Sequence, residues 1–370
     1  MKIAIICSST SSNSLGRALS MAITASCISE PTVYAFDDGP LWVGVSQFDH
    51  DVRAIELSQW SKLADDIARD PDTVVWASKS VRPVAEVLAR IRSQSPDHRI
   101  ITDFDDDDVS LMVEYRKQRI RNSISIHSRH RLHPARILDA QRVAVAHANA
   151  ATFSSNYLQQ TISSRDPRIS RLKTARIPHT RRSNQPHGAI FNRNLGDIIK
   201  VGFFGTVRPH KGLETLVRIA SHPGFQVQVF EGQVPNVHDN PSIKEISANS
   251  PLSGLYLDVD ILVIPSDADS QATLNQLPAK MVDAIAVGCP IAATRTPPIT
   301  EYLQDDYIQV QDWSNVDSLR RSMSPESLAS LSSRSRGIYE TDFSPQSTGN
   351  ALSELICSLT MSKVERGGNI

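Results

Sequence analysis

Two basic residues, Arg208 and Lys211, lie in a short loop after an apolar segment. That segment, Val201–Phe204, is rich in β-forming residues and predicts a buried strand that ends at Gly205. After Gly212, apolar residues recur at the spacing of a helix. A strand that turns directly into a helix presents free backbone N–H groups, which bind anions. The loop is therefore a candidate phosphate site, although an ordinary strand–helix connection with two solvated cations would show the same pattern.

Five aspartates gather at the end of another predicted strand, His98–Phe104. They are Asp103 and Asp105–Asp108. In open parallel sheets, ligands bind at the carboxyl ends of the strands. Closely spaced carboxylates repel one another, so the cluster needs cations, a metal ion, or hydroxyl and amide donors as partners. The alternative is a solvated acidic loop whose last aspartate caps a helix over Val109–Arg119.

A third set of residues lies on the predicted helix Pro278–Val287, which follows the predicted strand Asp260–Pro265. On this helix, Lys280 and Asp283 are nearly one turn apart. A lysine and a helix N-terminus can neutralise a diphosphate, and a carboxylate can accept hydrogen bonds from ribose hydroxyls. We therefore expect this helix to face the same ligand as Arg208, although a solvated position is the simpler interpretation of Asp283 alone.

The segments around these residues alternate between strand and helix patterns. The first half contains predicted strands at Lys2–Cys7, Thr32–Phe36, Thr73–Ala77 and His98–Phe104, and helices from Leu15 and over Leu57–Ile67 and Val84–Ile91. The second half contains predicted strands at Ile199–Phe204, Gln226–Phe230, Asp260–Pro265 and Pro290–Thr294, and helices over Leu213–Ala220, around Ile243–Asn249, and over Pro278–Val287, Val316–Arg321, Pro325–Ile338 and Thr348–Leu359. This alternation predicts an α/β fold with parallel sheets and right-handed crossovers.

The N-terminal strand is followed by a small-residue loop and a helix, as at the start of a Rossmann-like unit. Asn13, Ser14 and Gly16 fall in this region but do not form a Gly-x-Gly-x-x-Gly sequence, so the fingerprint of dinucleotide binding is absent. We expect these three residues to lie in the loop.

The chain has 370 residues, which fits two domains of ordinary size. The segment Thr180–Asp197 loses apolar periodicity and is rich in Arg, Asn, Pro and Gly, so it is the best linker candidate. We expect an N-terminal domain over residues 1–180, a linker over 181–197 and a second domain over 198–340. A C-terminal helix and tail over 341–370 could return to the N-terminal domain.

The composition is that of a soluble globular protein, with 40% hydrophobic and 21% charged residues. A net charge of −1 gives no general attraction to nucleic acid or to an anionic membrane. The four cysteines have no metal-ligand spacing, and no apolar run has the length of a membrane span. We therefore expect a cytoplasmic protein without a nucleic-acid partner.

The basic segment Arg116–Arg136, with its three histidines, predicts a solvated helical hairpin rather than a metal site, and it could contact a membrane surface.

Two C-terminal segments together resemble the C-terminal half of a GT-B glycosyltransferase of the large family-four type. They are Val201–Gly212 and Leu277–Thr294. In that family a Lys-Gly pair follows a Gly-Arg loop, and two glutamates eight residues apart precede an Ala-x-Gly-x-Pro-Val sequence. Here Lys211-Gly212 matches the Lys-Gly pair, Asp283 stands at the second glutamate, and Ala286–Ile291 matches the sequence after it.

The N-terminal half carries the same resemblance. Ile101–Asp107 resembles the Asp-x-Asp-Asp-Asp strand end of a subset of bacterial surface-polysaccharide glycosyltransferases. Ala148–Leu158 resembles a serine-rich segment of these enzymes, and Arg176–His179 resembles the Ile-Pro-Asn that precedes their linker. The resemblance covers most of the chain. It implies the GT-B fold, with two Rossmann-like domains whose parallel sheets face each other across a cleft.

The resemblance implies transfer of a sugar from a nucleotide diphosphate sugar, most simply a UDP- or GDP-sugar, to a hydroxyl acceptor. The reaction would be retaining, and neither a metal nor another cofactor would be needed. The implied diphosphate-binding residues are Gly205, Thr206, Arg208, Lys211 and Gly212. The implied ribose- and sugar-binding residues are Asn275, Lys280 and Asp283. The implied catalytic carboxylates are Asp103, Asp105 and Asp106, with Asn13, Ser14 and Gly16 on the acceptor side.

Three departures from the family pattern keep alternatives open. Thr206 stands where the family has arginine, with Arg208 as a substitute, and Asn275 stands at the first glutamate. Phe104 falls where many relatives carry an active-site histidine. A non-catalytic GT-B protein that binds nucleotide as a partner or scaffold is therefore the main alternative. A haloacid-dehalogenase phosphatase or a GT-A transferase, both based on Asp103–Asp105, would leave the C-terminal motifs unexplained.

Overall fold

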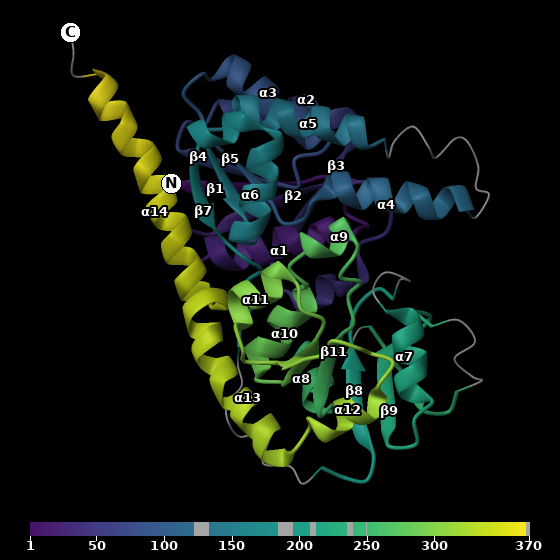
Figure 1. Cartoon of the computed structure of the whole chain (residues 1–370). Helices are drawn as coiled ribbons and strands as arrows, with labels where there is room; N and C mark the ends of the chain where they lie inside the picture. The colour runs from purple at the N-terminus through teal and green to yellow at the C-terminus, as the bar shows by residue number, and fades with distance from the viewer. Residues whose placement is uncertain (122–132, 184–194, 208–211, 235–239, 249, 368–370) are drawn as a thin grey trace. The chain divides into compact units, whose positions relative to one another are not determined.

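The computed structural model describes residues 1–121, 133–183, 195–207, 212–234, 240–248 and 250–367 (Figure 1). The chain folds into two compact units. The first comprises Met1–Thr180 together with Pro345–Ile370, and the second comprises Arg181–Ser344. The C-terminal helix therefore belongs to the unit that contains the N-terminal strands.

The first unit is built on a parallel sheet of seven strands in the order β3-β2-β1-β4-β5-β6-β7. The strands are β1 (Lys2–Cys7), β2 (Pro31–Asp37), β3 (Val52–Glu56), β4 (Thr73–Ser78), β5 (Arg99–Phe104), β6 (Ala150–Phe153) and β7 (Lys173–Arg176). The central strands β1 and β4 consist almost entirely of buried residues, as expected for a sheet covered by helices on both faces.

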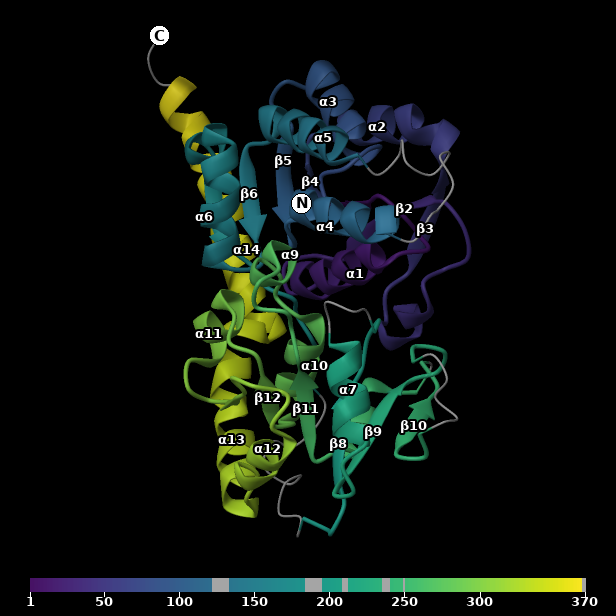
Figure 2. The same ribbon diagram turned by 45° about the vertical axis from the view of Figure 1, so that its right-hand side comes forward.

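Helices cover both faces of this first sheet (Figure 2). On one face, α1 (Asn13–Ala25) and α14 (Pro345–Gly367) pack together, and Leu15, Leu19 and Leu352 share a core with Ile5 and Trp76 of the sheet. On the other face lie α2 (Trp60–Ala68), α3 (Val84–Gln94) and α5 (Pro134–His147). The remaining helices of the unit are α4 (Asp108–Arg121) and α6 (Asn156–Arg165).

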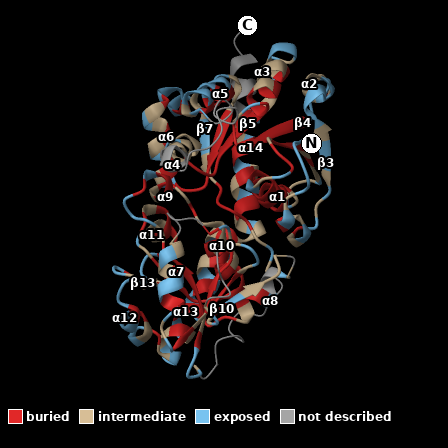
Figure 3. Cartoon of the chain, turned by 90° about the vertical axis from the view of Figure 1, so that its right-hand side faces the viewer, coloured by how far each residue is buried: buried red, intermediate tan, exposed pale blue. Residues whose placement is uncertain are grey.

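The second unit contains a parallel sheet of six strands in the order β10-β9-β8-β11-β12-β13. The strands are β8 (Ile199–Phe203), β9 (Phe225–Phe230), β10 (Ile243–Ile246), β11 (Ile261–Ile264), β12 (Ile291–Ala293) and β13 (Ile308–Gln309). The helices are α7 (Leu213–Ala220), α8 (Leu252–Leu257), α9 (Gln271–Leu274), α10 (Ala279–Val287), α11 (Pro297–Leu303), α12 (Val316–Arg321) and α13 (Pro325–Ile338). Buried residues are concentrated in β8, β9, β11, β12 and α10 (Figure 3).

Two α/β units with parallel sheets confirm the predicted fold class, but one predicted element is wrong. The sequence around Ile243–Asn249 predicts a helix, whereas Ile243–Ile246 forms strand β10 beside β9. Ile243 and Ile246 are three positions apart, which fits a helical period. The segment nevertheless forms a strand, because it pairs with β9. No helix among the residues described in the structure is long and apolar enough to cross a membrane.

Candidate functional site

The carboxyl end of β5 carries the acidic cluster, and Asp103 is one of its two fully buried members. Its two oxygens accept hydrogen bonds from Arg17 Nε at 2.9 Å and Arg17 Nη2 at 2.7 Å, and Thr152 Oγ1 donates to it at 2.6 Å. Arg17 also donates to the carbonyl oxygens of Ile177 and Pro178. Asp103 is fully buried. This network ties α1, β5 and β6 to the segment after β7, so the geometry gives Asp103 a structural role.

Asp107 is also paired. Its carboxylate accepts hydrogen bonds from the backbone N–H of Ser110 at 3.1 Å and from Ser110 Oγ at 2.6 Å, which caps the start of α4. Both oxygens also contact the guanidinium of Arg165, with Nη2 at 2.6 Å from Oδ2. Two of the five aspartates thus have their own arginine.

Lys79 is the common partner of the other three. Its Nζ lies 3.2 Å from Asp105 Oδ1, 2.9 Å from Asp106 Oδ2 and 3.2 Å from Asp108 Oδ1. Its backbone φ of +51° lies in the left-handed region, which is uncommon for a residue with a side chain. Burial by itself would lower the pKa of Lys79, but the three carboxylates outweigh burial and raise this pKa well above its usual value.

The pKa of Asp105 is far above the usual value of an aspartate. Burial raises its pKa to about 7, Asp106 and Asp108 add to the increase, and Lys79 opposes it. Its Oδ1 faces the lysine ammonium but has no hydrogen-bond partner among the described residues. A carboxyl group that titrates near neutral pH can exchange a proton with a substrate hydroxyl.

The sequence predicts the carboxylates of this cluster but not their cation. The position of Lys79 in the sequence could have identified it. Lys79 follows β4, the strand next to β5, and the carboxyl ends of neighbouring parallel strands lie at the same edge of the sheet. Among the described residues, no group of three or more His, Cys, Asp or Glu side chains is arranged to hold a metal ion.

The predicted acceptor-side residues lie in the first turn and a half of α1 rather than in a loop. The helix already begins at Asn13, because the Ser12 side chain accepts a hydrogen bond from the Ser14 N–H. Asn13 is exposed and Ser14 is buried. A Cβ at Gly16 would lie 2.9 Å from the Trp42 ring, so this glycine makes room for the indole.

In the second unit, the segment between β8 and α7 turns at two glycines. Gly205 has a φ of +153° and Gly212 a φ of +88°. A Cβ at Gly212 would lie 2.4 Å from Pro265 Cγ and 2.6 Å from the Pro265 carbonyl oxygen, so only glycine fits against the end of β11. Thr206 is exposed. Arg208 and Lys211, the two cations predicted to bind the diphosphate, fall outside the described residues.

Lys280, in the first turn of α10, lies beside the end of β8. Its Nζ is 3.2 Å from the centroid of the Phe203 ring and 3.7 Å from the position that a Cβ on Gly205 would take. The structure thus brings Lys280 and Gly205 together, at the carboxyl end of a central strand. A cation above an aromatic ring is attracted by the ring quadrupole, which holds the ammonium in place.

Asp283, one turn further along α10, is ion-paired with Arg181 through Oδ1 and the arginine Nε. Both side chains are largely buried. Burial raises the pKa of Asp283, and the charge and hydrogen bond of Arg181 together with a hydrogen bond from the Tyr256 hydroxyl oppose that increase. Arg181 carried no sequence signal beyond its place in the predicted linker. Asp283 therefore lies near Lys280 but already has a cationic partner.

Asn275 is buried at the end of the short helix α9. Its Nδ2 donates a hydrogen bond to the carbonyl oxygen of Gln271 at 3.1 Å. The amide thus closes the α9 turn, a contact in which a carboxylate could not donate.

No family model matches the sequence, and no curated protein matches it. Solved structures match along nearly the whole chain. Anabaena HepE in complex with UDP and glucose gives a TM-score of 0.73 at 15% identity, over 97% of this chain and 100% of HepE. The pneumococcal O-GlcNAc transferase GtfA in complex with UDP and GlcNAc gives 0.66 at 8% identity, over 97% and 99%. A glycosyltransferase from Rickettsia africae gives 0.65 at 14% identity, over 97% and 98%.

These similarities establish the fold. Each unit is a Rossmann-like α/β unit with a parallel sheet, and the chain has the GT-B fold that was predicted.

Proposed function

We propose that this protein transfers a sugar from a nucleotide diphosphate sugar, with UDP-sugars as the first donors to test, to a hydroxyl acceptor. The proposal is supported by the GT-B fold and by the contents of two similar structures, HepE with UDP and glucose and GtfA with UDP and GlcNAc. The acceptor class, retention at the anomeric carbon and independence of a metal are part of the proposal and rest on the sequence resemblance.

The observation that carries the proposal is the position of Lys280 beside Gly205 at the carboxyl end of β8. Cleavage of the donor builds negative charge on the leaving diphosphate, and a fixed ammonium beside a glycine backbone can stabilise that charge. In the proposal, Arg208 and Lys211 are two further cations beside Lys280. Together the three positive charges stabilise the diphosphate without a metal ion. Without a side chain at Gly205 or Gly212, the phosphates can approach the backbone closely.

In the first unit, Asp105 is the proposed acceptor of the substrate proton. For retention, the acceptor oxygen forms a bond to the anomeric carbon on the same face from which the diphosphate leaves. The bond from that carbon to the diphosphate oxygen breaks, and the hydroxyl proton moves to the carboxylate. A group with a pKa of about 7 is suited to this role, because it is both partly ionised and basic at neutral pH. Asp106, also predicted as catalytic, would act through the shared Lys79 ammonium.

A non-catalytic nucleotide-binding protein is the second candidate. Two observations favour it. Asn275 replaces a carboxylate and is held by the α9 backbone, and Asp283 is already paired with Arg181. Such a protein would bind a nucleoside diphosphate without releasing it from any donor.

The test measures binding of UDP, GDP and dTDP by calorimetry and release of each nucleoside diphosphate from its sugar donors. We expect one nucleotide to bind and its sugar donor to be turned over. Lys280→Ala should weaken nucleotide binding at least about tenfold, since a charge-assisted hydrogen bond contributes about 1.5–3 kcal/mol. Lys244→Ala, which removes an exposed lysine on β10, is the matched control. Binding without turnover of any donor favours the second candidate, and no nucleotide binding contradicts both.

A further inference from the structure

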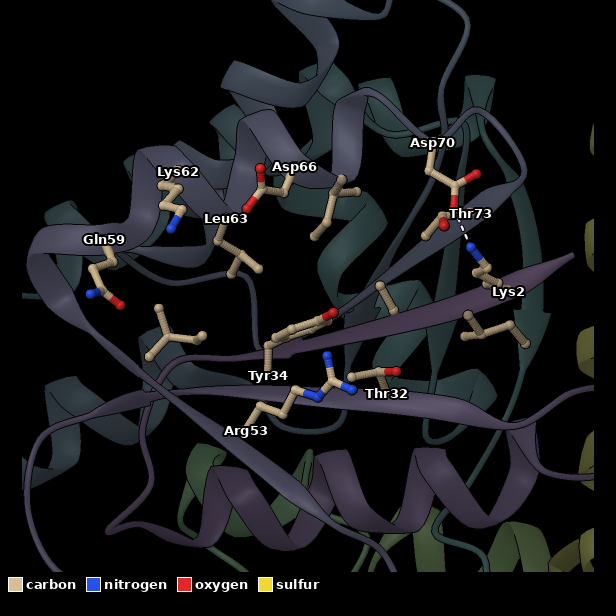
Figure 4. A pocket seen from close by; sticks show the side chains of 14 residues that line it. Lys2, Thr32, Tyr34, Arg53, Gln59, Lys62, Leu63, Asp66, Asp70 and Thr73 are labelled. Atoms are coloured by element: carbon tan, nitrogen blue, oxygen red, sulfur yellow. Dashed lines mark hydrogen bonds and ion pairs between the residues drawn. The ribbon is translucent and has the colours of Figure 1, made fainter.

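The first unit contains a cavity that the proposed reaction does not use. It has a volume of about 560 Å³ and lies between α2 and the first strands of the sheet (Figure 4). Small-molecule sites commonly measure about 300–1,000 Å³. Lys2 and Thr73, which begin β1 and β4, line the cavity. It therefore extends from the amino ends of β1 and β4 to β3 and the first turn of α2, where Arg53 and Lys62 lie, and its lining includes neither Lys79 nor any aspartate of the acidic cluster.

The cavity has an excess of positive charge. Both carboxylates in its lining have cations of their own: Asp70 lies 2.8 Å from Lys2, and Asp66 lies 2.9 Å from Arg69. The other two cations in its lining, Arg53 and Lys62, have no ion-pair partner among the described residues. These two side chains come from opposite sides of the cavity, Arg53 from β3 and Lys62 from α2 (Figure 4).

The position of Arg53 is supported by an aromatic ring. Its guanidinium carbon lies 5.8 Å from the centroid of the Tyr34 ring, within the range of a cation–π contact. Arginine stacked in this way keeps its N–H groups available for an anion at the edge of the ring. On the opposite side, Lys62 is in the first turn of α2, which contains no acidic residue, so the helix dipole adds to the positive potential.

The remaining lining of the cavity suits a small organic molecule that contains a ring rather than an inorganic ion. The apolar side chains of Leu63 and Ile67 and the Tyr34 ring form one part of the lining, and the hydroxyl of Thr32 and the amide of Gln59 supply hydrogen-bonding groups. An apolar surface combined with a few polar groups is the usual composition of a site for a small organic molecule.

We propose that this cavity binds a sugar-sized anion, with a phosphate or carboxylate group held between Arg53 and Lys62. Two sources would supply the same chemistry: a free sugar phosphate, or an acidic residue within a glycan chain. The site goes beyond the proposed transfer reaction, because none of its lining residues takes part in that reaction.

The test is titration of the full chain by calorimetry with three probes. These are glucose 1-phosphate, a tetrasaccharide of alternating glucuronate and N-acetylglucosamine, and neutral glucose. We expect an anionic probe to bind and glucose not to bind. The Arg53→Ala/Lys62→Ala variant should weaken binding at least about tenfold, because each charge-assisted hydrogen bond contributes that much or more. The control variant Arg142→Ala/Lys173→Ala removes the same charge from exposed positions of the same unit and should leave binding unchanged.

Hydrogen exchange locates the bound probe. Binding should slow exchange in β3 and the start of α2, and the cavity variant should lose this protection. Preference for glucose 1-phosphate would indicate a free ligand, and preference for the tetrasaccharide a glycan. Three results would overturn the proposal: no binding of either anion at millimolar concentration, equal binding of glucose, or equal binding by the cavity and control variants. Thermal unfolding of each variant checks that the exposed substitutions leave the fold intact.

Discussion

Arg181 pairs with Asp283, so the carboxylate that resemblance placed at the donor ribose is already bound by the first residue of the second unit. The backbone of this arginine is also fixed. The Tyr339 hydroxyl donates to its carbonyl oxygen at 2.9 Å, and its N–H lies 3.3 Å from the Phe343 carbonyl oxygen. Arg181 thus joins α10 to the segment that follows α13. The pair stabilises the second unit whether or not Asp283 also contacts a nucleotide.

Replacement of Arg181 tests this stabilising role. In Arg181→Ala, Asp283 stays buried without its main cation, and the free energy of unfolding should fall by about 3 kcal/mol. Arg334→Ala breaks an ion pair with Asp306 in which the arginine side chain is 50% exposed, so it should cost less than about 1 kcal/mol. Urea denaturation at pH 7 measures both variants. Adding Asp283→Asn to Arg181→Ala should recover part of the loss, and equal losses in the two arginine variants would argue against a special role of the buried pair.

The pKa of Asp105 makes stability depend on pH in a defined direction. Its folded-state pKa of about 7 is higher than that of an unfolded aspartate, about 3.9, so the folded protein binds this proton more tightly. The resulting stabilisation is complete below about pH 4 and is lost as the pH rises through about 7. Asp105→Asn removes this contribution. From pH 4 to pH 8, the unfolding free energy of the wild type should therefore fall relative to that of the variant, by at most about 4 kcal/mol.

Denaturant titrations of both proteins across this pH range provide the measurement. Asp108, whose pKa burial also raises, is present in both proteins, but Asp105→Asn removes a negative charge beside it, so the difference reports Asp105 together with its charge interaction with Asp108. Parallel pH profiles for the wild type and Asp105→Asn would show that Asp105 does not titrate in the expected range.

Gly212 offers a test of the turn before α7. Alanine at this position would adopt a left-handed backbone and would also place its Cβ within 2.6 Å of the Pro265 carbonyl oxygen. Gly232 is a matched control, because its φ of +70° imposes the same backbone strain while no atom lies within 4 Å of an added Cβ. Gly232→Ala should cost about 1–2 kcal/mol from strain alone. Gly212→Ala should cost clearly more and should also weaken nucleotide binding, which thermal unfolding and calorimetry measure. Equal costs would mean that the turn can move away from Pro265.

The sequence-based predictions are accurate where residues within a segment determine its secondary structure, and they fail where contacts with distant segments determine it. Helix α7 begins and ends at the predicted residues, because its apolar spacing and its initial glycine are contained within the segment. Strand β10 was predicted as a helix, because its four residues suit either period and only pairing with β9 selects the strand. A short segment therefore leaves the choice to tertiary contacts.

The candidate site shows the same limit for side chains. The sequence identifies the aspartates after β5 as unusual, but their partners come from distant elements. Arg17 precedes Asp103 by 86 residues, and Asp283 follows Arg181 by 102 residues. No pattern near either carboxylate identifies its arginine. The sequence thus locates the acidic cluster. Only the fold shows that Asp103 and Asp107 are paired with arginines, whereas Asp105 faces Lys79.

Lys79 should control the pH dependence of the proposed transfer reaction. Since its ammonium lowers the pKa of Asp105 against the effect of burial, Lys79→Met should raise that pKa further. For the wild type, we expect kcat/KM to rise with pH around a midpoint near 7, as the carboxylate ionises. In Lys79→Met the midpoint should move upward by about 1–3 pH units, the effect of removing one close opposite charge. Lys79→Arg keeps the charge and should restore most of the wild-type profile, whereas a merely structural role would lower activity equally at every pH. UDP release measured from pH 5 to pH 9 distinguishes these outcomes, and an unshifted midpoint in Lys79→Met would remove Asp105 from the proposed mechanism.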